Sequence, residues 1–268
     1  MRGKPGVTIW NLLLVPGTLF FSLLSGADVM QAMTQILKND AYYPCTNEEA
    51  GRITANSLTY AQAMAIPLVL VIGFLFDIFG RRLTTAAAFL TGAIATFLIP
   101  VVAPSIIGYD IVRILFVQTL VVMLSNPFIN DYVTVQSRGI ATGFQMIGLT
   151  MGNLISVGGL FTLTELIEDK IVSYGILAGL QIVWAVLVYL MVTEPNVRDE
   201  KEEKRNNKKS FCGKLWSMLK QAKKACIQDP ALLISLIALM PSRNTANLQQ
   251  SNFYIWIASE KFGLSPEV

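Results

Sequence analysis

Ionisable side chains within long apolar stretches are the residues of this sequence that could do chemistry. Arg113 lies inside an apolar run, Asp110 precedes it by three residues, and Asp28 ends the first apolar run. A charged side chain in such a run is costly in a bilayer and indicates a functional site. Residues three apart share a helix face, so Asp110 could pair with Arg113, and Asp28 could reach Arg113 from another helix. The alternative is that both aspartates lie at a wet rim, with Arg113 extending toward them.

A second polar set falls in the last apolar stretch of the chain. Arg243, Asn247 and Gln250 follow one another at i, i+4 and i+7, which places them on one helical face. A polar face at membrane depth must line water or a ligand. The alternative is that Pro241 ends a short helix and 242–252 is an exposed loop.

Uncharged polar residues complete the predicted cavity. We assign Gln118 to it, with weaker assignments for Asn56, Tyr60 and Gln62. Each of these amide or hydroxyl groups could equally form a hydrogen bond between two helices.

The residue inventory excludes several kinds of chemistry. The chain contains no histidine, which removes Ser/His and Cys/His pairs and imidazole metal sites. Its cysteines form no CxxC pair, so we predict free thiols at Cys45, Cys212 and Cys226. The lysines of 198–224 are interspersed with glutamates, which argues against nucleic-acid binding. We therefore predict no enzyme, no catalytic residues, no metal and no cofactor.

The composition indicates the elements that must position these residues. Of the 268 residues, 53% are hydrophobic and 15% are charged, against about 25% charged in a typical soluble domain. The mean hydropathy of +0.52 agrees with an integral membrane protein in contact with the lipid bilayer. Runs of about 20 apolar residues predict six spans, at 8–28 (continuing as a helix to about Lys38), 54–76, 83–103, 106–127, 139–163 and 173–193. The first run could instead be a secretory signal.

These spans predict three parts. Residues 1–193 form a six-helix transmembrane bundle, and 194–229 form a cytoplasmic linker with an amphipathic helix over 211–226. That helix lies either in the membrane interface or on the protein surface. Residues 230–268 hold a seventh transmembrane helix and the start of a truncated C-terminal half.

The distribution of basic residues predicts the orientation. With a cytoplasmic N-terminus, the inner segments hold fifteen basic residues and the outer segments four, which are Lys38, Arg52, Lys170 and Lys261. Because cytoplasmic loops are enriched in Lys and Arg, we expect the N-terminus inside. The sequence does not indicate which membrane holds the protein.

The loop between the second and third predicted spans carries a specific pattern of glycines and charges. It consists of Gly73, Asp77, Gly80, Arg81 and Arg82. This pattern resembles the signature loop of the major facilitator superfamily, although Ile78 stands where that family usually has a basic residue. Gly73 would let a neighbouring helix approach closely, and Asp77 could accept hydrogen bonds from a helix N-terminus or an arginine.

Other segments share this resemblance. Asp131 and Arg138 resemble the second cytoplasmic charge cluster of the family, which pairs with the first loop. The fifth span holds two G-x-x-x-G spacings, at 139–143 and 148–152, which predict close helix packing. Asn153 follows Gly152 where the antiporters of the family have a proline, so we do not assign an antiporter.

The resemblance implies an all-α fold with a six-helix half built from inverted three-helix repeats, and a cavity between two such halves. It implies a secondary active transporter that moves a small solute by alternating access, with protons as one possible coupling ion. Arg113 and Arg243 favour an anionic solute. The alternative is a non-transporting membrane subunit that retains the fold. Seven spans make only part of a two-half protein, so we expect a truncated chain, or a half that a second copy completes.

Overall fold

A computed structural model of the chain describes residues 2–4, 6–39, 41–124, 127–160 and 166–194, and the single residues 213, 216, 220, 227 and 228. The chain divides into two compact units, 1–196 and 197–268. Every helix given below belongs to the first unit. The predicted seventh span and most of the predicted linker helix lie outside the described residues.

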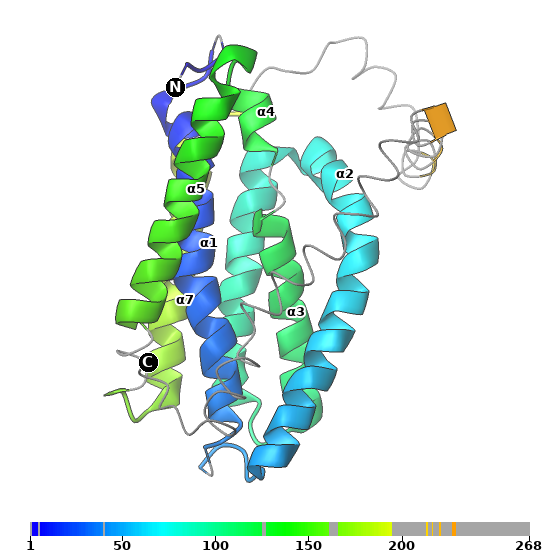
Figure 1. Cartoon of the computed structure of the whole chain (residues 1–268), viewed down its shortest axis with the longest axis vertical. Helices are drawn as coiled ribbons and strands as arrows, with labels where there is room; N and C mark the ends of the chain where they lie inside the picture. The colour runs from blue at the N-terminus through cyan, green and yellow to red at the C-terminus, as the bar shows by residue number, and fades with distance from the viewer. Residues whose placement is uncertain are drawn as a thin grey trace. The chain divides into compact units, whose positions relative to one another are not determined.

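Helix α1 (Ile9–Ile36) is the first long helix (Figure 1). The hydroxyl of Thr8 caps it by accepting a hydrogen bond from the backbone N–H of Asn11. The helix contains 28 residues, with Pro16 inside it, and thus exceeds the roughly 20 residues that a membrane crossing needs. It continues beyond the predicted span, in agreement with the expected extension toward Lys38.

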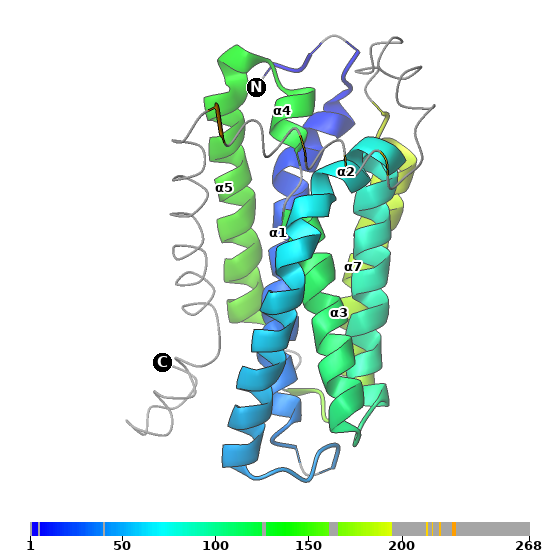
Figure 2. The same cartoon turned by 90° about the vertical axis from the view of Figure 1, so that its right-hand side faces the viewer.

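Helix α2 (Asn47–Val101) consists of two arms that meet at Gly80. A capping box starts the first arm, since Thr46 and Glu49 each accept the other's backbone N–H at 3.1–3.3 Å. Gly80 has φ 81° and ψ 169°, a region that is essentially restricted to glycine. The chain reverses there, and α3 lies between the two arms in Figures 1 and 2.

The remaining described elements are shorter. They are α3 (Ile106–Leu124), α4 (Phe128–Tyr132), the 3-10 helix η1 (Val135–Ser137), α5 (Arg138–Ile155), the π-helical turn η2 (Ser156–Leu160) and α7 (Lys170–Met191). The long helices agree with the all-α fold that the sequence predicts.

Five segments of the described chain are long and apolar enough to cross a membrane: Ile9–Gly26, Ile72–Val101, Ile106–Tyr132, Val135–Leu160 and Lys170–Met191. The predicted second span, 54–76, is helical throughout, but most of it precedes the second of these segments. The first arm of α2 is therefore a sixth long helix that does not appear among the five segments.

The helices pack in two main groups. Helix α2 packs against α3 and α7, and α1 packs against α5; Figure 2 shows α5 alongside α1. A Cβ atom at Gly148 would overlap the carbonyl of Pro16, and one at Gly152 would overlap the carbonyl of Phe20. The close packing predicted for this pair of glycines is thus confirmed. At Gly139 and Gly143, by contrast, an added Cβ would meet no described atom within 4 Å.

Candidate functional site

Arg81 is the centre of a charge cluster at the turn of α2. Its Nε donates to Oδ2 of Asp131 at 2.8 Å, and one terminal nitrogen donates to Oδ1 of Asp77 at 3.0 Å. The same terminal nitrogen donates to the backbone carbonyl of Phe76 at 2.6 Å. The side chains of Arg81 and Asp131 are both only partly exposed, so the charge-assisted hydrogen bond between them is less screened than an ordinary surface pair. Arg81 therefore joins both arms of α2 to α4.

Glu194 completes this cluster from the far end of the first unit. Its carboxylate accepts the backbone N–H of Arg81 at 3.2 Å and that of Arg82 at 2.7 Å. These amides are the unpaired donors at the start of the second arm of α2, where the helix dipole favours an anion. A Cβ at Gly80 would lie 2.6 Å from a carboxylate oxygen of Glu194. The glycine therefore makes room for the capping carboxylate.

The sequence analysis did not identify Glu194 as a site residue. The signal available was its position, since it is the acidic residue that ends the sixth apolar run on the same predicted side as Arg81. Next to it, Asn11 on α1 donates to the carbonyl of Thr193 at 2.7 Å. The guanidinium of Arg82 lies over the ring of Tyr189, 4.4 Å from its centroid. The end of α7 is thus fixed to both α1 and α2.

The other predicted residues of this cluster contribute less. Nε of Arg138 is buried and has no hydrogen-bond partner among the described residues. A Cβ at Gly73 would meet no described atom within 4 Å, so the close helix approach expected there does not occur within the described residues. The segment at the N-terminus lies nearby, because the N–H of Lys4 donates to the carbonyl of Tyr132 and the N–H of Thr134 to that of Arg2.

Arg113 lies on α3, and its side chain is buried. One terminal nitrogen donates to the hydroxyl of Tyr109 at 2.8 Å, and that hydroxyl donates to the carbonyl of Met33 on α1 at 3.0 Å. Within the described residues, Arg113 forms no ion pair with Asp110. The side chain of Asp28 lies outside the described residues.

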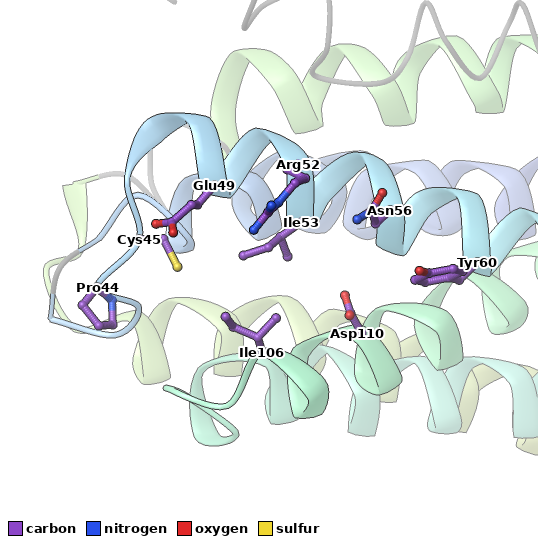
Figure 3. A pocket seen from close by; sticks show the side chains of 9 residues that line it. All are labelled: Pro44, Cys45, Glu49, Arg52, Ile53, Asn56, Tyr60, Ile106 and Asp110. Atoms are coloured by element: carbon purple, nitrogen blue, oxygen red, sulfur yellow. The ribbon is translucent and has the colours of Figure 1, made fainter.

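A pocket of about 420 Å³ opens between α2 and α3 at the end opposite the Arg81 cluster. Its lining is Pro44, Cys45, Glu49, Arg52, Ile53, Asn56, Tyr60, Ile106 and Asp110. Figure 3 shows the carboxylate of Asp110 pointing from α3 toward α2. Arg113 and Gln118 are not among the lining residues. Gln118 instead donates to the carbonyl of Ala61 at 2.8 Å and so links α3 to α2.

The remaining predicted site residues, Arg243, Asn247 and Gln250, lie outside the described residues. In the described part of the chain, no group of three or more His, Cys, Asp or Glu side chains is arranged to hold a metal ion.

The comparisons with known proteins agree with this architecture. A family model described as Major Facilitator Superfamily matches residues 10–267, which is nearly the whole chain. A search of curated proteins gives no significant match. The family match includes the Arg81 loop and all the long helices, and the chain therefore belongs to the Major Facilitator Superfamily of membrane transporters.

Proposed function

We propose that this protein is a secondary active transporter that moves a small solute by alternating access, with its N-terminus in the cytoplasm. The observation that carries the proposal is the set of bonds around Arg81, which joins α2, α4 and the end of α7. Such a cluster is suited to a gate, because its short polar bonds have one good arrangement and are lost together when the helices separate.

In this proposal the cluster keeps the cytoplasmic side closed. Arg81 holds Asp77 and Asp131, and Glu194 fixes the start of the second arm of α2. Opening the cytoplasmic side breaks these bonds, and solute or ion binding supplies the free-energy difference between the two states. In this proposal a second six-helix half faces this one.

The transported solute in this proposal carries an anionic group such as a carboxylate, because Arg113 and Arg243 are the cations placed in predicted spans. Asp28 and Asp110 are the carboxylates that could exchange a proton with water during transport. The burial of Arg113 supports a role inside the protein, since an unneutralised guanidinium in an apolar region is costly.

Uptake into proteoliposomes tests the proposal. A panel of small carboxylate-bearing solutes, with and without an ammonium group, is offered under proton and sodium gradients, with wild type, Asp131→Asn and Glu194→Gln. Wild type should accumulate at least one of these solutes, and both variants should transport it more slowly because the closed gate is weakened. Glu168→Gln is the control, since Glu168 is exposed at the other end of the bundle.

This assay distinguishes a transporter from a non-transporting membrane subunit. No accumulation or exchange by wild type under any gradient contradicts transport and favours a non-transporting membrane subunit. Normal uptake by Asp131→Asn and Glu194→Gln contradicts the gate while leaving transport intact.

A further inference from the structure

The pocket between α2 and α3 contains a carboxylate that forms no ion pair among the described residues. Oδ1 of Asp110 is buried and has no hydrogen-bond partner in the described part of the chain. Arg113, three residues along the same helix, directs its described hydrogen bond to Tyr109 instead. A carboxylate in this position is stabilised by a cation that enters the pocket.

The other polar groups of the pocket leave the carboxylate of Asp110 available. Oε2 of Glu49 accepts from the backbone N–H and the hydroxyl of Thr46, so Glu49 is part of the helix cap. Arg52 is exposed at the pocket wall and forms no described ion pair. Glu49 and Asp110 carry two negative charges against the one positive charge of Arg52, which leaves the lining net negative.

We propose that this pocket binds the ammonium group of a small organic solute, with Asp110 as its anchor and the Asn56 amide and Tyr60 ring beside it. The volume of about 420 Å³ falls within the range of about 300–1,000 Å³ that is typical of small-molecule pockets. The aromatic ring of Tyr60 is a suitable neighbour because ring faces attract cations. The inference rests on the proposed transport function only in taking this ammonium group to belong to the transported solute.

Such a solute carries an ammonium group for Asp110 and an anionic group for Arg113, so its two ends meet opposite charges at different depths of the protein. The anionic group is the one already proposed for the transported solute, and the ammonium group is a second group by which the protein would recognise it.

Cys45 provides a probe within the pocket lining. Burial and the neighbouring Glu49 carboxylate raise the pKa of the Cys45 thiol, so its labelling is followed at mildly alkaline pH, where more thiolate is present. With Cys212→Ser and Cys226→Ser in the full chain, a neutral maleimide reports on Cys45 alone. A bound molecule should slow that labelling.

Three probes have the same number of carbon atoms but differ in charge: n-butylammonium is positive, n-butanol is neutral and butyrate is negative. We expect n-butylammonium to protect Cys45, and n-butanol and butyrate not to. Asp110→Asn should weaken that protection by about tenfold, which is the scale of one lost charge-assisted hydrogen bond. Arg52→Gln removes the competing cation and should strengthen the protection of Cys45 by n-butylammonium.

Equal protection by all three probes, or no protection by n-butylammonium, overturns the inference. Unchanged protection in an Asp110→Asn variant that elutes as a single species also overturns it. If that variant does not fold, Arg52→Gln and the three probes decide the matter. The labelling assay measures binding without transport. If n-butylammonium protects Cys45 in a protein that shows no uptake, the proposed binding pocket stands and only the proposed transport is contradicted.

Discussion

At the turn of α2, the single side chain of Arg81 connects several segments of the chain. Its guanidinium bonds two carboxylates and one carbonyl, while its backbone N–H bonds Glu194. A lysine has no planar fork and could not satisfy these partners in the same directions. The signature loop thus acts through directional hydrogen bonds as well as through its positive charge.

Gly80 is the residue on which this geometry depends. Gly80→Ala should lower the free energy of unfolding by about 1–3 kcal/mol, because its backbone conformation is unfavourable for any residue with a Cβ. The added Cβ would also displace the carboxylate of Glu194. Gly73→Ala is the matched control, since nothing described lies near that Cβ. Thermal unfolding in detergent measures both, and equal melting temperatures would argue against the role of Gly80.

Substitution of Arg113 tests the proposed binding site for the anionic group of the solute. Arg113→Ala should insert into the membrane and fold but lose transport. Tyr109→Phe removes the hydroxyl that Arg113 bonds and should reduce transport less. Uptake assays on variants with matched membrane expression measure both effects. Unchanged uptake in Arg113→Ala would remove Arg113 from the proposed site.

At the scale of elements, α1 and α5 approach each other so closely that their backbones are in contact. The carbonyls of Pro16 and Phe20 lie where a Cβ at Gly148 or Gly152 would be. Small residues allow this approach, which gives van der Waals contact along much of both helices.

Gly152→Ala should therefore separate α1 from α5 and lower the free energy of unfolding by about 1–3 kcal/mol, the usual effect of overpacking. Gly143→Ala on the same helix meets open space and should leave stability unchanged or slightly raise it through its better helix propensity. Thermal unfolding of the two variants side by side measures the difference. Equal destabilisation by both would show that helix packing is not the cause.

The sequence predicted the elements better than their contacts. Apolar runs of sufficient length identified the long helices, and the spacing from Gly73 to Arg82 identified the family. The role of Glu194 could not be predicted, because its partners lie 112 and 113 residues away in the sequence. Arg113 was identified as a buried charge, but its bond to Tyr109 depends on rotamers that no sequence pattern specifies.

For the whole molecule, the distribution of fifteen basic residues against four predicts a cytoplasmic N-terminus. With the native cysteines replaced by serine, Gln136→Cys should resist a membrane-impermeant maleimide in intact cells and react after permeabilisation. Glu168→Cys should react in intact cells. Both positions are exposed, at opposite ends of the bundle. The reverse pattern of labelling would place the N-terminus outside.

The carboxylate that caps the second arm of α2 has a consequence for the order of biosynthesis. Glu194 follows Arg81 by 113 residues in the chain. During synthesis, the start of the second arm of α2 therefore lacks its capping carboxylate until α7 has been made. Trypsin should therefore cleave at Arg81 and Arg82 in chains arrested before residue 194, and cleave more slowly in longer ones. The end of α7, the last helix of the bundle to be synthesised, would then be the segment that stabilises the loop from Gly73 to Arg82.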